Sequence, residues 1–253
     1  MAKNVDNPFS LTGKVILLSG GAGFLGKYFT RALAQAGATV ITADISKNAN
    51  IQMDVSDKQS VQNGFSQIIN KYRKIDVVIN NAAIDPKFDS QTGDNKKLFQ
   101  NYPERLLDQS LDVNLKGCVL VAQQAIKQML KQKQGNIINI SSIYGLAGPD
   151  QRIYPPGTQK PVDYAITKGG IVMLTRYLAT TYGNKNIRAN TLSLGGVLKN
   201  HSQIFQQKYG QRTPFGRMAS PKEVGSPLVF LASDASAYMT GANLIVDGGW
   251  LAW

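Results

Sequence analysis

The stretch that decides the fold is residues 14–26, KVILLSGGAGFLG, where an apolar run meets a glycine-rich turn. Its first half has the apolar character of a buried strand, and residues 24–36 carry apolar side chains at the spacing of a helix. The turn contains the pattern G-x-G-x-x-G at Gly21, Gly23 and Gly26. Glycines let the backbone turn tightly and approach a pyrophosphate, whose charge lies at the helix N-terminus. This stretch therefore predicts a strand, turn and helix that bind a dinucleotide.

A carboxylate follows the next predicted strand. Asp44 comes 18 residues after Gly26, directly behind the apolar run 39–43, where it can accept hydrogen bonds from the adenosine ribose hydroxyls. It would repel a 2′-phosphate and no Arg follows closely, which favours NAD over NADP, although Lys47 is a nearby cation. The alternative is an ordinary turn residue after a strand, beside a glycine turn that binds nothing.

Apolar runs alternate with segments of helical period along the whole chain. This alternation predicts an α/β fold, a single doubly wound Rossmann-type domain over residues 1–253 with a parallel sheet of about seven strands flanked by helices. The expected strands are 14–19, 39–43, 51–54, 75–80, 136–141, 187–192 and 243–246. The expected helices are 24–36, 58–72, 111–130, 164–182 and 223–232.

Three stretches rich in turn-forming residues interrupt this pattern. Residues 84–103 are polar, residues 145–163 hold four prolines, and residues 195–221 are punctuated by Gly and Pro around a short helix near 204–209. Long loops in a compact domain are usually functional. We expect the loops at about 145–163 and 195–221 to bind the substrate.

Composition excludes several classes of function. One Cys and one His leave no intrachain disulfide and no zinc site of the usual ligands. We expect no metal site, although a metal held by carboxylates alone stays open. The formal net charge of +12 favours anionic partners, but the cations are spread along the chain without the block of like charges that marks a nucleic-acid arm. No apolar run is long enough to cross a membrane, and the first residues lack the pattern of a secretion signal. We therefore expect a cytoplasmic protein that binds neither nucleic acid nor membrane.

Tyr164 and Lys168 form a candidate catalytic pair. Residues at i and i+4 of a helix share one face, so the lysine can lie beneath the phenol. A nearby ammonium lowers a phenol pKa from about 10 towards neutrality, which would let the tyrosine exchange a proton with an alcohol or carbonyl oxygen. The alternative is a pair of neighbours on a solvated helix face.

A third motif, NISSIYG at residues 139–145, lies at the end of a predicted strand. With this motif, the glycine turn and the Tyr164–Lys168 pair, the chain resembles the short-chain dehydrogenase/reductase family. The resemblance runs from about Gly13 to Gly249. Further features that carry it in the family's order are Asp54-Val55, the run NNAA at 80–83, Asn114, Asn190, Thr240-Gly241 and VDGG at 246–249.

The resemblance implies a set of site residues. Tyr164 would be the general acid or base, Lys168 would depress its pKa and bind the nicotinamide ribose, Ser142 would bond the substrate oxygen, and Asn114 would hold a water for proton relay. The catalytic residues so implied are Asn114, Ser142, Tyr164 and Lys168. The cofactor-binding residues are Gly20, Gly23, Phe24, Leu25, Gly26, Asp44, Asp54, Val55, Asn81, Ala82, Ala83, Tyr164, Lys168, Gly195 and Val197.

The chain departs from the family pattern in three places. Phe24 stands where glycine is usual, Leu194 stands where proline is usual, and the distance from Ser142 to Tyr164 is longer than is common. Residues 148–162, hereafter the insertion, should fold over the substrate side of the cleft. The loop behind Leu194 should be less stiff than in relatives.

The expected function is interconversion of a secondary alcohol and a ketone with NAD(H). A weaker likeness to dehydrogenases of surface-polysaccharide and flagellin-glycan biosynthesis implies a sugar or sugar phosphate, an anionic small molecule in the latter case. The alternatives are a 3-oxoacyl thioester reductase and an NAD-binding sensor or scaffold without turnover. Relatives commonly assemble through the helices beginning near Leu111 and Tyr164, which implies a homotetramer or homodimer.

Overall fold

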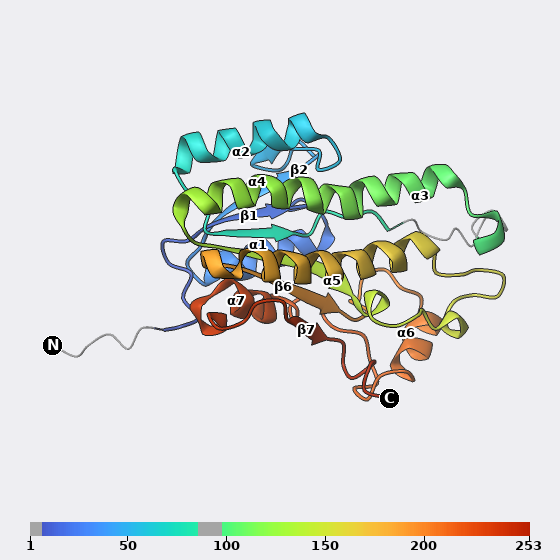
Figure 1. Cartoon of the computed structure of the whole chain (residues 1–253). Coiled ribbons are helices and arrows are strands. Elements are labelled where there is room, and N and C mark those ends of the chain that lie inside the picture. Colours follow the sequence, from blue (N-terminus) through green and yellow to red (C-terminus); the bar gives the residue numbers. More distant parts are fainter. Residues whose placement is uncertain (1–6, 86–97) are drawn as a thin grey trace.

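The computed structural model describes residues 7–85 and 98–253. Within them the chain forms one seven-stranded sheet of parallel strands in the order β3-β2-β1-β4-β5-β6-β7 (Figure 1). The strands are β1 (Val15–Ser19), β2 (Thr39–Asp44), β3 (Ile51–Gln52), β4 (Val77–Asn80), β5 (Gly135–Ser142), β6 (Ile187–Leu194) and β7 (Asn243–Val246). All the expected strands are present, and the doubly wound α/β prediction is confirmed.

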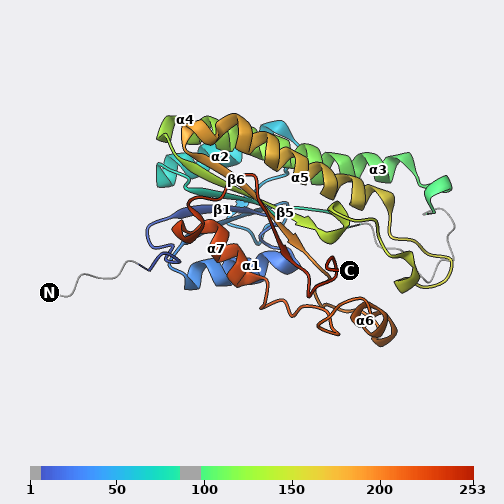
Figure 2. The same cartoon turned by 60° about the horizontal axis from the view of Figure 1, so that its bottom comes forward.

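Helices cover both faces of this sheet (Figures 1 and 2). On one face lie α1 (Phe24–Gln35) and α7 (Gly225–Ala232), which bury Phe29, Leu33 and Leu228 against Ile16 and Leu18 of β1. On the other lie α2 (Lys58–Tyr72), α4 (Gly117–Gln132) and α5 (Val162–Tyr182), with the core of that face built from side chains such as those of Phe65, Val121 and Leu178. The near-continuous apolar runs of the strands follow from this burial on both faces.

The start of one helix lies seven residues before the predicted position. The helix expected to begin at Leu111 begins at Glu104, as α3 (Glu104–Ser110), and continues through a π-helical turn, η3 (Leu111–Lys116), into α4. Pro103 precedes its first residue, and residues 104–110 give only a weak signal of a core-facing helix, because Ser110 alone among them is buried. The loop expected at 84–103 lies partly outside the described residues, and its end forms a 3-10 turn, η2 (Phe99–Asn101).

The two expected substrate loops contain short helical elements. The 145–163 stretch holds the end of η4 (Ile143–Gly145), then η5 (Gln151–Ile153), and it ends as α5 begins at Val162, two residues earlier than expected. The 195–221 stretch holds α6 (Gln203–Gly210), close to the helix expected there. Both stretches project on the side where the parallel strands end (Figure 2).

The strand order reverses between β1 and β4, and such a point is where ligands bind in an open α/β sheet. The registers align the carboxyl ends of the strands: Ser19 pairs with Ala43, Leu18 with Ile79, and Ser142 with Leu194. Side chains and loops that follow these ends are therefore neighbours in space.

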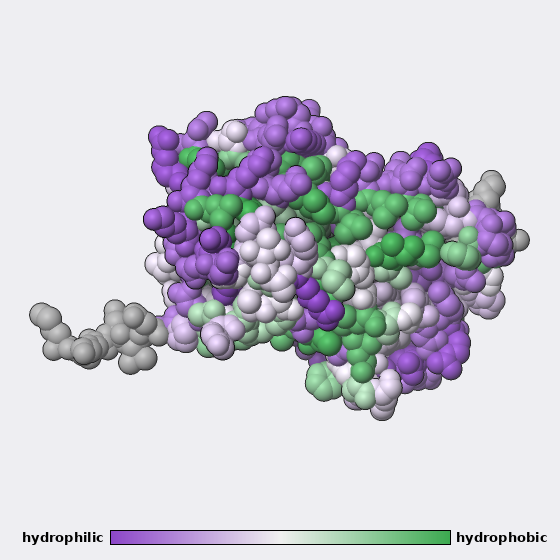
Figure 3. Space-filling view, in the orientation of Figure 1, coloured by the Kyte–Doolittle hydropathy of each residue, from purple (hydrophilic) through white to green (hydrophobic). Residues whose placement is uncertain are grey.

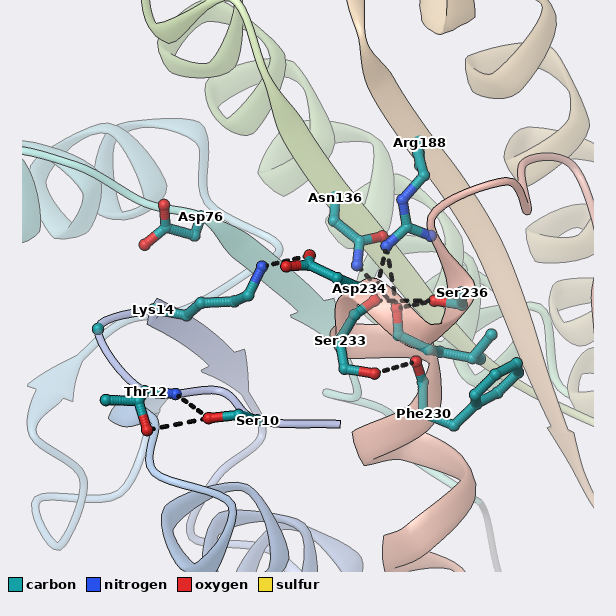
Figure 4. Close-up of polar contacts among 12 residues, drawn as sticks. Ser10, Thr12, Lys14, Asp76, Asn136, Arg188, Phe230, Ser233, Asp234 and Ser236 are labelled. Carbon is teal, nitrogen blue, oxygen red and sulfur yellow. Dashed lines mark hydrogen bonds and ion pairs between the residues drawn. The ribbon is translucent and has the colours of Figure 1, made fainter. Parts of the chain in front are cut away.

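A polar network lies at the amino ends of β5 and β6, at the opposite end of the strands from the glycine turn (Figure 4). Arg188 of β6 donates to the carbonyl oxygens of Met239, Leu231 and Ser233 at 3.2, 3.4 and 3.3 Å. Asn136 of β5 donates to the Leu231 carbonyl oxygen at 2.8 Å. The carbonyls of Leu231 and Ser233 lie at the end of α7, where they have no partner within the helix, and that of Met239 lies in the segment that leads to β7.

Across residues 7–85 and 98–253, no helix combines the length and apolarity needed to span a membrane.

Candidate active site

The glycine-rich turn joins β1 to α1 by a backbone path that only glycine fits. Gly20 has φ of +66°, in the left-handed region, and a Cβ there would lie 2.7 Å from the Ala82 Cα. A Cβ on Gly26 would collide with the carbonyl groups of Gly20 and Gly21. No side chain caps the first turn of α1, which follows Gly23. This cradle fits a dinucleotide pyrophosphate at the helix N-terminus.

Asp44 ends β2 beside this turn. One carboxylate oxygen accepts the Ala22 N–H at 3.1 Å, and the other accepts the Ser46 N–H at 3.0 Å. The side chain is half-buried between the glycine turn and the loop after β2. These two bonds orient an acceptor towards the position that the adenosine ribose takes in a dinucleotide bound on such a turn.

The segment after β4 holds the glycine turn in place. Asn81 donates from its side-chain amide to the carbonyl oxygens of Ser19 and Gly20, at 3.1 and 3.0 Å. The backbone N–H groups of Asn81 and Ala82 both donate to the Ser19 hydroxyl, at 3.1 and 3.2 Å. Asn81 therefore acts as a positioning residue for the turn, while Ala82 and Ala83 follow along the cleft.

Asp54 and Val55 follow β3 at the same edge. The exposed Asp54 carboxylate accepts the N–H and the hydroxyl of Ser56, at 2.8 and 2.6 Å. Val55 is buried against Gly117, where a Cβ would lie 2.8 Å from Val55 Cγ2. The approach of α4 to this end of the cleft therefore depends on glycine at position 117.

The predicted catalytic side chains come together from β5 and α5. Ser142, the last residue of β5, is buried, accepts the Tyr144 N–H at 3.2 Å, and acts through its hydroxyl to lower the pKa of Tyr164. Lys168 is buried, and its ammonium donates to the Ile140 carbonyl oxygen at 3.0 Å and lies 5.6 Å from the centre of the Tyr164 ring. The i,i+4 prediction for Tyr164 and Lys168 is confirmed in its geometry, because both side chains lie on the face of α5 that meets β5.

Asn114 lies in the π-helical turn between α3 and α4 and is fully buried. Its amide is paired twice with the backbone of Ile84, accepting the N–H at 2.8 Å and donating to the carbonyl oxygen at 2.9 Å. It also donates to the Thr167 hydroxyl at 3.3 Å, one residue before Lys168. Asn114 therefore ties the segment after β4 to the catalytic face of α5.

The protein's own groups raise the pKa of Tyr164, contrary to the expected lowering. Burial has the largest effect, the negative charge of Asp85 adds to it, and the hydrogen bond from Ser142 acts in the opposite direction. Burial likewise lowers the pKa of Lys168, with a further lowering from Lys160. Desolvation disfavours the charged form of each group, and sequence spacing carries no information about it.

Two loops cover the substrate end of the cleft. Their buried side chains join those of η4 and of the segment after β7 in a separate cluster made of Ile143, Tyr144, Ile153, Tyr154, Tyr209, Met218 and Trp250. Behind β6, Gly195 donates to the Val246 carbonyl oxygen at 2.9 Å and Gly196 to the Tyr209 hydroxyl. The loop was expected to be less stiff because Leu194 replaces proline, but these hydrogen bonds to β7 and α6 restrain it. Lys199, further along, lies 4.9 Å from the ring centre of Phe24 and so brings the loop over the start of α1.

Sequence reasoning missed two charged residues at Tyr164, namely Asp85 and Lys160. Lys160 lies 3.9 Å from the centre of the tyrosine ring and is ion-paired with Asp85 at 2.6 Å. The only signal for them was the unusual length of the insertion that carries Lys160, and no spacing rule connects it to Asp85.

The sequence and the structure match known proteins over almost their whole length. A family described as enoyl-(acyl carrier protein) reductase matches residues 17–251. The 3-oxoacyl-(acyl-carrier-protein) reductase of Thermotoga maritima is 34% identical, over 94% of this chain and 98% of its own. The post-translational flagellin modification protein A of Campylobacter coli is 33% identical, over 95% and 99%.

Two solved structures show the same fold. A short-chain dehydrogenase of Leptospira borgpetersenii with bound NAD+ superposes with a TM-score of 0.86 at 31% identity, over 99% of this chain and 96% of its own. A gluconate 5-dehydrogenase of Burkholderia cenocepacia in complex with NADP and tartrate has a TM-score of 0.86 at 25% identity, over 97% and 98%. The chain belongs to the short-chain dehydrogenase/reductase family, and is an oxidoreductase acting on CH–OH and C=O groups.

Proposed function

We propose that this protein interconverts a secondary alcohol and a ketone with NAD(H). The observation that carries the proposal is the meeting of Ser142, Tyr164 and Lys168 at the carboxyl edge of the sheet, on the same edge as the glycine turn and Asp44. A proton donor and a hydride carrier placed side by side are what carbonyl reduction needs.

In the reductive direction, the Tyr164 O–H bond breaks as its proton passes to the carbonyl oxygen. A nicotinamide cofactor bound on the glycine turn would supply the hydride that reduces the carbon. The Ser142 hydroxyl, which acts on the same phenol, donates to the substrate oxygen as negative charge develops on it. Lys168 would bind the nicotinamide ribose and counter the charge left on Tyr164. Asn114 would hold the water that returns a proton through Lys168. In the oxidative direction Tyr164 accepts the proton instead.

The preference for NAD rests on Asp44. Its carboxylate lies beside the turn that would hold the pyrophosphate, where a 2′-phosphate would meet its negative charge. Gly20, Gly23, Phe24, Leu25 and Gly26 would hold the pyrophosphate, while Asp54, Val55 and the run 81–83 would line the adenine and ribose side. Gly195 and Val197 would face the nicotinamide.

For the substrate we favour a sugar or sugar phosphate. Likeness over the full length to a flagellin modification protein and to a gluconate 5-dehydrogenase supports a polyhydroxylated molecule. The loops over the site carry paired charges: Arg152 and Arg212 both pair with Asp150, at 2.8 and 2.9 Å. The second candidate, a 3-oxoacyl thioester, is favoured by the relative from Thermotoga maritima.

The test is a fluorescence titration of the purified protein with NADH and NADPH, followed by turnover on keto-sugars, sugar phosphates and 3-oxoacyl thioesters. Tighter binding of NADH with turnover of the sugars is the expected result. Turnover of the thioesters alone would replace the substrate assignment by the second candidate. Tight binding without any turnover would favour a sensor, and no binding of either nucleotide would overturn the proposal.

A further inference from the structure

The insertion between Ser142 and Tyr164 brings a second ammonium group to the tyrosine. Lys160 Nζ lies 3.9 Å from the centre of the Tyr164 ring, closer than Lys168 Nζ at 5.6 Å. The Lys160 side chain is only 11% exposed. Its backbone N–H donates to the Gln151 side-chain oxygen at 2.8 Å. The next residue is Pro161, which precedes the first turn of α5 and restricts the backbone there. Lys160 is therefore held over the ring.

A carboxylate from another part of the chain pairs with this ammonium. Asp85 Oδ1 lies 2.6 Å from Lys160 Nζ. Asp85 directly follows Ile84, whose backbone is bonded on both sides to Asn114. The negative charge of Asp85 raises the pKa of Tyr164. The pair thus places one positive and one negative charge beside the same phenol.

The other polar groups that face Tyr164 are accounted for. Within the described residues they are Ser142 and Tyr144 from the end of β5 and η4, Tyr154 from the insertion, and Lys168 from the next turn of α5. The neighbouring Asp163 carboxylate instead accepts the hydroxyl of Ser110. Lys160 and Asp85 are therefore the charged groups at the phenol that the catalytic roles above leave unused.

We propose that Lys160 and Asp85 are a charge-balanced pair that sets the reactivity of Tyr164, with Lys160 favouring the ionised tyrosine and Asp85 opposing it. This inference rests on the proposed function, in which Tyr164 exchanges a proton with the substrate. A cation over an aromatic face is attracted by the ring, and the attraction grows when the phenol loses its proton and carries a full charge. Because both partners lie close to the phenol, each acts on it with the opposite sign.

The pair has a consequence for the insertion. Without Lys160, Asp85 would face the tyrosine uncompensated and would hold it protonated. The insertion therefore supplies a positive charge, that of Lys160, which offsets the negative charge of Asp85. Tyr164 can then ionise even though Asp85 lies beside it. Lys160 and Asp85 are positioning residues in this role, since neither needs to touch the reacting atoms.

The test measures alcohol oxidation as NADH formed, across pH, because Tyr164 must lose its proton before it can act as a base. Lys160→Met, which keeps the length of the side chain and removes its charge, should move the rising limb of kcat to higher pH by about one unit. Asp85→Asn should move it to lower pH. The double variant should return close to wild type, and Lys160→Arg should restore the wild-type limb.

A matched control is Lys14→Met. Lys14 pairs with Asp234 at 2.7 Å on the far edge of the sheet (Figure 4), so its loss removes an equivalent ion pair without reaching the tyrosine. Melting temperature and NADH affinity, measured on every variant, show that the fold and the cofactor site are retained. The proposal is overturned if both single variants move the limb in the same direction, or if Lys160→Met changes KM alone and leaves the limb in place, since Lys160 would then be a substrate contact.

A second readout needs no substrate. The tyrosinate absorbance of each protein is titrated with base, and the titration of the same protein carrying Tyr164→Phe is subtracted. The onset of Tyr164 ionisation should come earliest in Asp85→Asn, later in wild type and latest in Lys160→Met. An identical onset in all three overturns the inference. A protein that shows the expected order but oxidises no alcohol would contradict the proposed function and leave the pair intact.

Discussion

Tyr164 lies where separate segments of the chain meet, and its chemistry depends on all of them. Ser142 reaches it from the end of β5, Lys168 from the next turn of α5, and Lys160 from the insertion. Burial and the negative charge of Asp85 oppose its ionisation, the hydroxyl of Ser142 favours it, and two ammonium groups lie near the ring. The balance of these effects, rather than any one of them, sets how readily the phenol gives up its proton.

Tyr164→Phe removes the hydroxyl that exchanges the proton and keeps the ring. We expect kcat to fall by at least about 100-fold, because proton transfer by a positioned side chain contributes on this order or more. NADH affinity, measured by fluorescence titration, should change little. Near-normal turnover by this variant would show that another group moves the proton.

Asp44→Ser keeps a short polar side chain and removes the negative charge at the end of β2. We expect the ratio of kcat/KM for NAD to that for NADP to fall by about tenfold, which is the effect of roughly 1.4 kcal/mol of lost discrimination. The measurement is steady-state kinetics with both nucleotides. An unchanged ratio would mean that the carboxylate does not select the cofactor.

At the scale of elements, the turn between β1 and α1 depends on the close approach of backbone to backbone. Gly26→Ala places a methyl group against the carbonyl groups of Gly20 and Gly21. We expect the free energy of unfolding to fall by about 1–3 kcal/mol, as for other overpacked sites, and NADH affinity to fall with it. Urea denaturation and nucleotide titration measure the two effects.

The matched control for this variant is Gly183→Ala. Gly183 follows α5 with helical backbone angles, and a Cβ there would meet nothing within 4 Å. It should be neutral or slightly stabilising. Equal losses in the two glycine variants would contradict the close approach seen at Gly26.

The opposite edge of the sheet depends on Arg188. Replacing it with Met keeps much of the side-chain length but leaves the carbonyl oxygens of Leu231, Ser233 and Met239 without this donor. We expect a loss of about 2–3 kcal/mol in the free energy of unfolding, since hydrogen bonds to charged donors are the stronger kind.

Lys14→Met, at the same edge, serves as the comparison in urea denaturation. Its partner Asp234 is 73% exposed, and exposed ion pairs contribute at most about 1 kcal/mol. A loss at Arg188 no larger than the loss at Lys14 would mean that water replaces the arginine.

At the scale of the whole molecule, α5 leaves an apolar stripe uncovered. Ile166, Met173 and Tyr177 of α5 are 50%, 60% and 62% exposed, and Leu130 at the end of α4 is 42% exposed. Figure 3 shows apolar patches on this face of the molecule, over the helices α4 and α5. Exposed apolar surface of this extent suits contact with a second copy, as the resemblance implied.

We therefore expect a dimer or tetramer by light scattering, and Met173→Arg should shift the mass towards the 27.5 kDa of one chain. The control is Gln67→Arg on the exposed side of α2, which adds the same charge outside this stripe. A wild-type mass of 27.5 kDa at every concentration would contradict the prediction.

The sequence by itself determined the architecture. Strands buried on both faces appear as unbroken apolar runs, amphipathic helices appear as spacings of three and four, and each signal is local. The order of the motifs indicated the family, and with it the catalytic residues Ser142, Tyr164 and Lys168. The early start of the helix at Glu104 escaped detection because few of its residues touch the core.

Only the tertiary structure decided the electrostatics of the site. The upward shift in the pKa of Tyr164 comes from burial and from Asp85, and the ion pair joins Asp85 to Lys160 across 75 residues. It also assigned Asn81 and Asn114 to backbone partners that no spacing could indicate. Desolvation and charge pairing depend on which groups are close in space, whereas a sequence pattern records only which are close along the chain.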